Sequence, residues 1–249
     1  MSPTVLLIGT LDTKGEEYAY LRDRLREAGV EALLADVGTR EPPTVEPDFS
    51  REEVGAATGA DPAALAAAGD RGAAVTAMAD AAAVFTKRLH DEGRIQGVLA
   101  AGGSGNTAIA TRAMQALPVG FPKLMVSTMA AGDVREYVGA RDITMMPSVT
   151  DVAGINQISA RVLANAASAM AGMVNAKPVE IPEERPLIGV SMFGVTTPCV
   201  TVARDELEKL GYEPVVFHAT GVGGRSLESL MESGFLKAVL DITTTELCD

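Results

Sequence analysis

A glycine-rich turn in the middle of the chain has residue types that suit a bound phosphate. The segment GVLAAGGSGNTAIA, residues 97–110, passes from an apolar run through this turn into an apparent helix. Glycines let the backbone approach a phosphate closely, and the free amides at the start of a helix attract negative charge. The alternative is a tight strand-to-helix reversal that holds no ligand. The predicted phosphate contacts are Gly102, Gly103, Ser104, Gly105, Asn106 and Thr107.

The spacing of Gly103, Gly105 and Ala108 is the G-x-G-x-x-A of a dinucleotide fingerprint, which also expects an acid at the end of the next strand. Here the next strand ends in Ser127 and Thr128. Their hydroxyls can donate to a phosphate but carry no charge for a ribose diol. The strand that does end in an acid, at Asp36, belongs to another unit of the pattern. The sequence therefore favours a phosphate ligand over a nicotinamide cofactor.

A second polar turn, GTLDTKGEE at residues 9–17, follows the first apolar run. Asp12 is of the type that holds a magnesium ion, and Lys14, with Thr10 nearby, is of the type that meets a phosphate. Thr13 and Glu16 have the spacing of a capping box, which accounts for these two residues without any ligand. The chain contains no G-x-x-x-x-G-K-[ST] motif, so the sequence does not support a P-loop ATPase mechanism.

Further candidates follow later apolar runs. Asp151 is a second possible ligand for magnesium. His218, in FHATGVGGR, is either a structural histidine or an acid, base or phosphate donor, and Arg225 follows in the same segment. Glu246 closes the polar run TTTE near the end of the chain.

The elements that must position these residues alternate between short apolar runs and stretches of helical period, which predicts an α/β fold with parallel sheets. In such sheets ligands bind beyond the carboxyl ends of the strands, where the candidate residues accumulate. We expect a Rossmann-like nucleotide-binding subdomain over 1–175, a proline-rich linker at 176–186 and a partial second Rossmann-like subdomain over 187–249. Three strands and two helices make a thin domain, so the chain is expected to be a fragment or to be completed by another subunit. The segment 38–60, rich in Pro, Gly and charge, predicts a long surface loop of a kind that often forms lids.

Composition excludes several classes of protein. With 249 residues, 47% of them hydrophobic, the chain can bury a core, and its net charge of −12 argues against nucleic acid or anionic membrane as a partner. No apolar stretch reaches the roughly 20 residues that span a bilayer. The two cysteines, Cys199 and Cys248, lack metal or redox spacing, which favours a reduced cytoplasmic setting.

Seven motifs in one order carry a resemblance to a known family: GTLDTKGEE, GGSGNT, PKLMVSTMAAGD, SVTDVAGIN, SMFGVTTPCV, FHATGVGGRSLE and DITTTE. From Val5 to its last residue the chain resembles the family that contains the N-terminal domain of the tomato mosaic virus resistance protein and largely uncharacterised bacterial and fungal proteins. The resemblance implies two Rossmann-like subdomains, ATP or a related nucleotide at the first, and homodimers. It also implies that the family continues beyond Asp249, so this chain is expected to be a C-terminally shortened member. Asn106 stands where the family usually has glycine, and Ala131 where it usually has serine.

The resulting hypothesis is a protein that binds ATP or a related phosphorylated small molecule. Its triphosphate lies on the amides of 102–107 and on Ser127 or Thr128, Lys14 neutralises charge, and Asp12 or Asp151 holds magnesium. His218, Arg225 and Glu246 are expected to face this site across an inter-domain cleft. Two alternatives stay open: a metabolic enzyme that acts on a phosphorylated or carboxylated metabolite with His218 as acid or base, and a nucleotide-stabilised module that binds a protein partner, as the plant relative does with a viral replication protein.

Overall fold

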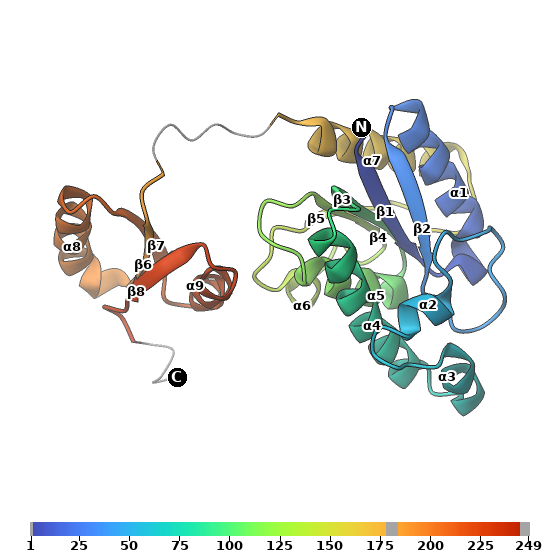
Figure 1. Cartoon of the computed structure of the whole chain (residues 1–249), viewed down its shortest axis with the longest axis horizontal. Helices are drawn as coiled ribbons and strands as arrows, with labels where there is room; N and C mark the ends of the chain where they lie inside the picture. The colour runs from blue at the N-terminus through green and yellow to red at the C-terminus, as the bar shows by residue number, and fades with distance from the viewer. Residues whose placement is uncertain (1, 178–183, 245–249) are drawn as a thin grey trace. The chain divides into compact units, whose positions relative to one another are not determined.

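The computed structural model describes residues 2–177 and 184–244. The chain divides into two compact units: Met1–Val138 with Asp142–Lys177, and Pro178–Asp249 with Gly139–Arg141. Each unit has one sheet whose strands all run parallel, with helices between consecutive strands (Figure 1). This arrangement confirms the α/β class with two parallel sheets that the alternating pattern predicts.

The first sheet has five strands in the order β2-β1-β3-β4-β5. The order changes direction between β1 and β3, because β2 lies on one side of β1 and all later strands lie on the other. At such a point the connections on the two sides diverge and leave a crevice beyond the carboxyl ends of the strands. The strands are β1 (Thr4–Gly9), β2 (Glu31–Asp36), β3 (Gly97–Gly102), β4 (Lys123–Ser127) and β5 (Thr144–Pro147).

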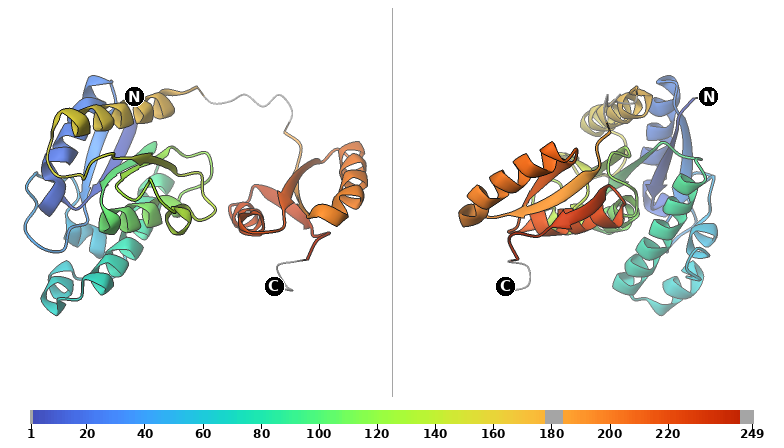
Figure 2. Two further views of the ribbon diagram at one scale, coloured as in Figure 1. Left: turned by 180° about the vertical axis from the view of Figure 1, so that it is seen from behind. Right: turned by 60° about the vertical axis from the view of Figure 1, so that its left-hand side comes forward.

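Helices cover both faces of this sheet, as the two opposite views in Figures 1 and 2 show. Helices α1 and α7 lie on one face, and α4 and α5 lie on the other with the short helices α2 and α3 near them. The bounds are α1 (Leu11–Glu27), α2 (Arg51–Gly55), α3 (Pro62–Ala68), α4 (Arg71–Asp91), α5 (Ser104–Gln115), α6 (Arg135–Val138) and α7 (Gln157–Asn175).

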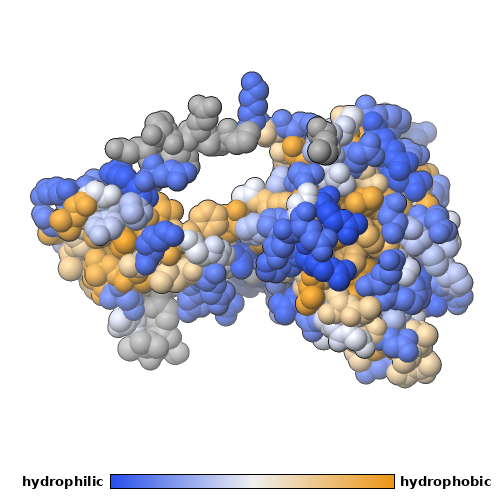
Figure 3. Space-filling model, in the orientation of Figure 1, coloured by the Kyte–Doolittle hydropathy of each residue, from blue (hydrophilic) through white to orange (hydrophobic). Residues whose placement is uncertain are grey.

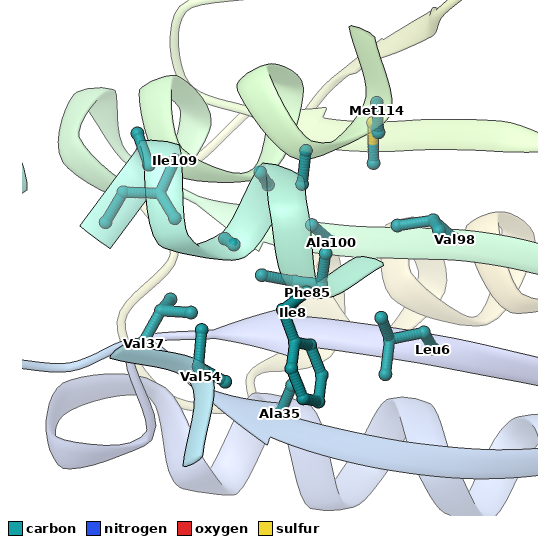
Figure 4. Packing of buried hydrophobic residues seen from close by; sticks show 14 of the residues in the cluster. Leu6, Ile8, Ala35, Val37, Val54, Phe85, Val98, Ala100, Ile109 and Met114 are labelled. Atoms are coloured by element: carbon teal, nitrogen blue, oxygen red, sulfur yellow. The ribbon is translucent and has the colours of Figure 1, made fainter. Parts of the chain in front are cut away.

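The core of the first unit is split by the sheet into two layers. Alternate side chains of β1 point to opposite faces, so Leu6 packs in the layer that includes Phe85 of α4, whereas Leu7 packs in the layer that includes Leu21 of α1. Figure 4 shows the first layer, with Leu6, Ile8 and Phe85 among its labelled side chains. Burial on both faces explains why these strands read as continuous apolar runs.

The start of α1 differs from the sequence prediction. The helix begins at Leu11, and Lys14 has non-helical backbone angles (φ −129°, ψ 18°) that kink its first turn. The hydroxyl of Thr13 donates to the carbonyl of Thr10 at 3.3 Å, so the predicted capping box of Thr13 and Glu16 is wrong. The kink keeps the first turn separate from the rest of the helix and holds Asp12 and Lys14 at the carboxyl end of β1.

The loop between β2 and α2 is attached along its length. The amide and hydroxyl of Thr44 both donate to the carbonyl of Leu11, at 2.9 and 3.0 Å. Further along, the Asp48 carboxylate accepts the amide of Leu34 at 2.8 Å, and the carbonyl of Phe49 accepts the amide of Asp36 at 3.0 Å. The segment predicted as a surface loop of the lid kind is therefore hydrogen-bonded to the edge of β2 and to the start of α1.

The second unit is thinner. Its sheet has the order β7-β6-β8, and its buried apolar cluster consists of Ile188, Val190 and Val200 with four partly buried neighbours. Large apolar side chains remain at its surface, including Val195 (91% exposed) and Leu210 (71% exposed), and Figure 3 shows apolar patches on this unit. Its elements are β6 (Leu187–Met192), η1 (Gly194–Thr196), α8 (Thr197–Lys209), β7 (Glu213–His218), α9 (Val222–Glu232) and β8 (Leu236–Leu240).

Within the described ranges, no helix combines the length and apolar character that crossing a membrane requires.

Candidate functional site

A cleft of about 300 Å³ lies at the carboxyl ends of β1 and β3, where the strand order changes direction. Its walls come from five segments of the chain: the turn after β1, the loop after β2, the start of α4, the start of α5, and the loop after β5. The lining residues are Thr10, Asp12, Thr13, Lys14, Val37, Thr39, Arg40, Arg71, Val75, Gly103, Ser104, Gly105, Asn106, Ile109 and Asp151.

The N-terminus of α5 forms one wall of the cleft. Gly103 precedes the helix in an extended conformation and has no side chain to cap it. The first backbone hydrogen bond inside the helix runs from the amide of Thr107 to the carbonyl of Gly103 at 2.9 Å. The amides of residues 104–106 therefore precede the helical ladder and carry the positive end of the helix dipole. They belong to three of the six residues, 102–107, that the glycine-rich turn predicts as phosphate contacts, whereas Gly102 and Thr107 do not line the cleft.

Three cationic side chains line the same cleft: Lys14, Arg40 and Arg71. The ammonium of Lys14 donates to the backbone carbonyl of Val152. In the described part of the chain, none of the three pairs with a carboxylate. Positive charge concentrated in one cleft of a protein with a net charge of −12 favours an anionic ligand. The sequence motifs do not point to Arg40 or Arg71. Arg40 reaches the cleft from a loop and Arg71 from the start of a helix, and no motif connects either segment to the glycine turn.

Two carboxylates also border the cleft. Oδ2 of Asp12 accepts the amide of Arg40 at 3.1 Å, whereas its Oδ1 is shielded from solvent and has no hydrogen-bond partner among the described residues. Oδ1 of Asp151, which is exposed, accepts the amide of Val152 at 2.8 Å. Across the described ranges no three His, Cys, Asp or Glu residues group together as metal ligands. One or two carboxylates are what Mg²⁺ uses when phosphates supply its other ligands, and Asp12 fits that mode.

A buried polar network lies below the glycine turn. The side-chain nitrogen of Asn106, Nδ2, donates to the hydroxyl of Tyr18 at 2.9 Å and to the carbonyl of Ala101 at 3.0 Å. The backbone amide of Ala101 also donates to the Tyr18 hydroxyl, at 2.9 Å. The Tyr18 hydroxyl in turn donates to the carbonyl of Ile8. Burial raises the pKa of Tyr18 far above its ordinary value. The side-chain amide of Asn106 therefore joins β1, β3 and α1, and only its Oδ1 is left without a partner among the described residues.

Thr107 and Ser127 are buried and hydrogen-bonded to each other. Their hydroxyl oxygens are 2.7 Å apart, the Thr107 hydroxyl also donates to the carbonyl of Gly103 at 2.9 Å, and Ser127 accepts the amide of Met129 at 2.9 Å. The structure places neither hydroxyl in the cleft lining. Their visible role is to tie the start of α5 to the end of β4.

Asp36 has a similar inward position. Its carboxylate is 1% exposed and accepts the amides of Leu11 (3.1 Å) and Gly38 (2.9 Å) and the Nε of Arg51 (2.7 Å). Burial raises the pKa of this carboxyl, and the hydrogen bonds from Gly38 and Arg51 oppose the shift. The structure places Asp36 behind the first turn of α1, where it joins β2 to the turn that carries Asp12 and Lys14.

Two further predicted residues, His218 and Arg225, belong to the second unit. His218 is exposed at the end of β7, its Nδ1 is 2.8 Å from the hydroxyl oxygen of Thr220, and its ring makes an edge contact with Phe193 at 5.4 Å between centroids. Arg225 is exposed on α9. Glu246 lies outside the described residues.

A second groove, of about 350 Å³, lies at the carboxyl ends of β4 and β5 in the first unit. Thr128 lies here, and Asp151 lines this groove as well as the cleft. Its rim includes Val149, which has a φ of 66° and is the one non-glycine residue with positive φ in the described part of the chain. Positive φ is costly for a β-branched residue.

Replacing Val149 with glycine is therefore expected to stabilise the protein. The left-handed conformation costs a non-glycine residue about 1–2 kcal/mol, which exceeds the entropy cost that glycine adds. We expect the free energy of unfolding in urea to rise by about 1 kcal/mol. Val84→Gly is the matched control, because Val84 is also exposed but lies inside helix α4, where glycine should lower stability. A decrease in the Val149 variant equal to that of the control would show that Val149 is not strained.

Comparison with known families gives a match over both units. Residues 3–179 match the model described as the N-terminal domain of the uncharacterised protein family UPF0261, and residues 185–249 match the model of its C-terminal domain. A UPF0261 protein of Clostridium tetani is 49% identical over 249 residues, which cover 100% of this chain and 62% of that protein. One from Rhizobium meliloti is 50% identical over 245 residues, covering 98% and 60%.

The chain also matches a plant protein. The ToMV resistance protein Tm-1(GCR237) of Solanum lycopersicum is 40% identical over 268 residues, which cover 100% of this chain and 36% of the plant protein. The chain thus spans about 60% of the length of the two bacterial relatives and a smaller share of the plant one.

Solved structures give weaker similarities. A putative UDP-N-acetylglucosamine 2-epimerase from Listeria monocytogenes aligns with a TM-score of 0.38 at 11% identity, covering 99% of this chain and 71% of that one. The Methanocaldococcus jannaschii UDP-GlcNAc 2-epimerase, solved with UDP-GlcNAc and UDP, aligns with a TM-score of 0.35 at 8% identity, covering 97% and 73%.

Proposed function

Because this chain belongs to the UPF0261 family, which is described as uncharacterised, we propose a function from the site itself: the first unit binds ATP or a related phosphorylated small molecule in the cleft between β1 and β3. The observation that carries this proposal is the convergence of two kinds of positive group. The uncapped N-terminus of α5 and the side chains of Lys14, Arg40 and Arg71 line one cleft at the point where strand order changes direction. Both kinds of group attract phosphate.

Different parts of such a ligand would contact different parts of the cleft. Its phosphates would accept the amides of residues 104–106, and the cations would neutralise their charge. Val37, Val75 and Ile109 give the cleft apolar surface for the part of the ligand that carries no charge. The unpartnered Oδ1 of Asp12 would take part in holding Mg²⁺ beside the phosphates.

Thermal unfolding in the presence of separate ligands tests the proposal. A ligand at 100 times its dissociation constant adds about 2.7 kcal/mol to the stability of the folded state. We expect Mg-ATP and Mg-ADP to raise the melting temperature more than AMP, and inorganic phosphate to raise it at high concentration. NAD, which lacks a terminal phosphate, should have little effect. A folded chain that none of these compounds stabilises would contradict the proposal.

Gly105→Val gives a variant that should separate binding from folding. A Cβ at Gly105 would lie 3.5 Å from the Arg71 guanidinium and 3.8 Å from Val75, both of which line the cleft, so the fold accepts the atom but the cleft loses space. We expect ATP to bind about tenfold more weakly, a cost within the range for overfilling a packed site, with the melting temperature of the free protein nearly unchanged. Gly172→Val is the matched control. Gly172 lies on α7, a Cβ there would meet no atom within 4 Å, and the residue does not line the cleft. Equal ATP affinity in the two variants would place the ligand elsewhere.

A further inference from the structure

The groove at the ends of β4 and β5 adjoins the proposed phosphate site. Asp151 lines both cavities. A Cβ at Gly103, the residue before α5, would lie 3.8 Å from the hydroxyl oxygen of Thr128, which lines the groove. The groove therefore adjoins the N-terminus of α5. Its volume of about 350 Å³ is enough for a separate small molecule.

The chemistry of the groove differs from that of the cleft. The residues that line it are Ser127, Thr128, Ala131, Pro147, Ser148, Val149, Thr150 and Asp151. Four of these carry hydroxyl groups, one carries a carboxylate and none is a cation. A second phosphate or carboxylate would meet the negative charge of Asp151 with no Lys or Arg of the lining to offset it, so the lining disfavours an anion.

Several polar groups of the groove are free to bind. The hydroxyls of Ser127 and Ser148 are engaged, with Thr107 and with the carbonyl of Thr150 respectively. The Thr150 hydroxyl, by contrast, is shielded from solvent and has no hydrogen-bond partner among the described residues. Shielded polar groups normally find a partner, and each exception calls for an explanation. Thr128, which also lines the groove, is exposed, and one oxygen of Asp151 accepts a backbone amide while the other remains for a ligand.

We infer that this groove binds a second small molecule that carries several hydroxyl groups and no negative charge, next to the phosphates of the first ligand. Hydroxyl groups of such a molecule can donate to the Asp151 carboxylate and exchange hydrogen bonds with Thr128 and Thr150. The inference rests on the proposed function for the identity of its neighbour, and on the groove alone for its own chemistry. It makes the first unit a site for two ligands at one edge of the sheet, with Asp151 between them.

Saturation-transfer NMR on the whole chain, with Mg-ATP present, tests the inference with three probes: ribitol as the uncharged polyol, ethanolamine as a cation and malate as an anion. Two variants of Ala131 form a matched pair, because Ala131 is exposed, lines the groove and does not line the cleft. Leucine fills the groove, and serine keeps it open. We expect ribitol to receive saturation from the wild type and from Ala131→Ser, and to lose it in Ala131→Leu, while malate receives none.

The outcomes separate the two proposals. If Mg-ATP stabilises all three proteins but ribitol shows no transfer, or the same transfer in Ala131→Leu, the groove inference is overturned and the proposed function stands. If malate or ethanolamine binds and ribitol does not, the assignment of ligand class is overturned. If Mg-ATP stabilises none of the proteins and ribitol still binds in a way that Ala131→Leu abolishes, the groove is supported and the proposed function fails.

Discussion

Replacing Lys14 with methionine is expected to weaken the binding of Mg-ATP by about 10- to 150-fold, measured by isothermal titration calorimetry. A hydrogen bond to a charged group contributes about 1.5–3 kcal/mol, and each 1.4 kcal/mol is a factor of ten in affinity. Lys14 is held at the mouth of the cleft by the kink in α1, with its ammonium on the carbonyl of Val152. Methionine keeps the length and apolar stem of the side chain, so the change removes mainly the charge.

Lys87→Met is the matched control for this experiment. Lys87 is an exposed lysine of α4 that pairs with Asp91 one helical turn away, and it does not line the cleft. Its loss should leave ATP affinity unchanged. The affinity of the Lys14 variant should also become less sensitive to salt, because one phosphate contact is gone. An equal loss of affinity in both variants would show that the effect comes from the net charge of the protein. No loss in either variant would show that Lys14 does not contact the ligand.

Replacing Tyr18 with phenylalanine is expected to lower the free energy of unfolding by about 3 kcal/mol. The change removes the hydroxyl that accepts the amide of Ala101 and the side-chain amide of Asn106. Asn106 keeps its bond to the carbonyl of Ala101 at 3.0 Å, but the buried amide of Ala101 loses its acceptor, and a buried donor without a partner costs about 1–3 kcal/mol. Urea unfolding at neutral pH measures the loss. Because the network lies under the glycine turn, the variant should also bind ATP less tightly.

Tyr20→Phe is the control for the second prediction, since the Tyr20 hydroxyl makes one partly buried bond to the carbonyl of Ala160 at 3.1 Å. Its loss should cost about 1 kcal/mol. The pH dependence gives an independent test. The folded pKa of Tyr18 is raised above its unfolded value of about 10, so its contribution to stability is full below pH 10 and falls as the pH rises beyond it. The wild type should therefore lose more stability between pH 9 and pH 11 than Tyr18→Phe does, and parallel curves would contradict the buried network.

The fold was largely predictable because its signals are local. Strands buried on both faces appear as apolar runs, and helix ends carry their own signatures. Asp61 caps α3 by accepting the amides of Ala63 and Ala64, with Pro62 in the first turn, and Gly29 follows α1 with a φ of 75°, the left-handed conformation that glycine adopts at helix ends. The kink at Lys14 could not be predicted from helix propensities. Contacts with distant loops hold the first turn of α1: Leu11 accepts the amide of Thr44 in the loop after β2, and Lys14 donates to Val152 in the loop after β5.

The site was predictable only as a set of strand ends. Parallel strands present their carboxyl ends at one edge, so Thr10, Asp12, Lys14 and the glycine turn do meet in one cleft. The direction of each side chain is a separate matter. Thr107 and Ser127 have the same hydroxyl chemistry as exposed phosphate ligands, yet they are paired with each other inside the sheet edge. Hydrogen-bond pairing of this kind depends on strand register, which the spacing of residues does not reveal.

The most direct test of the central claim is an NMR titration of the amide resonances of α5 with Mg-ATP. If the phosphates lie over the N-terminus of this helix, the amide protons of Ser104, Gly105 and Asn106 gain charged acceptors. We expect these three resonances to show the largest downfield shifts in the spectrum, saturating with the same dissociation constant as the thermal stabilisation. Saturable binding that leaves the three resonances unmoved and shifts others instead would contradict the account.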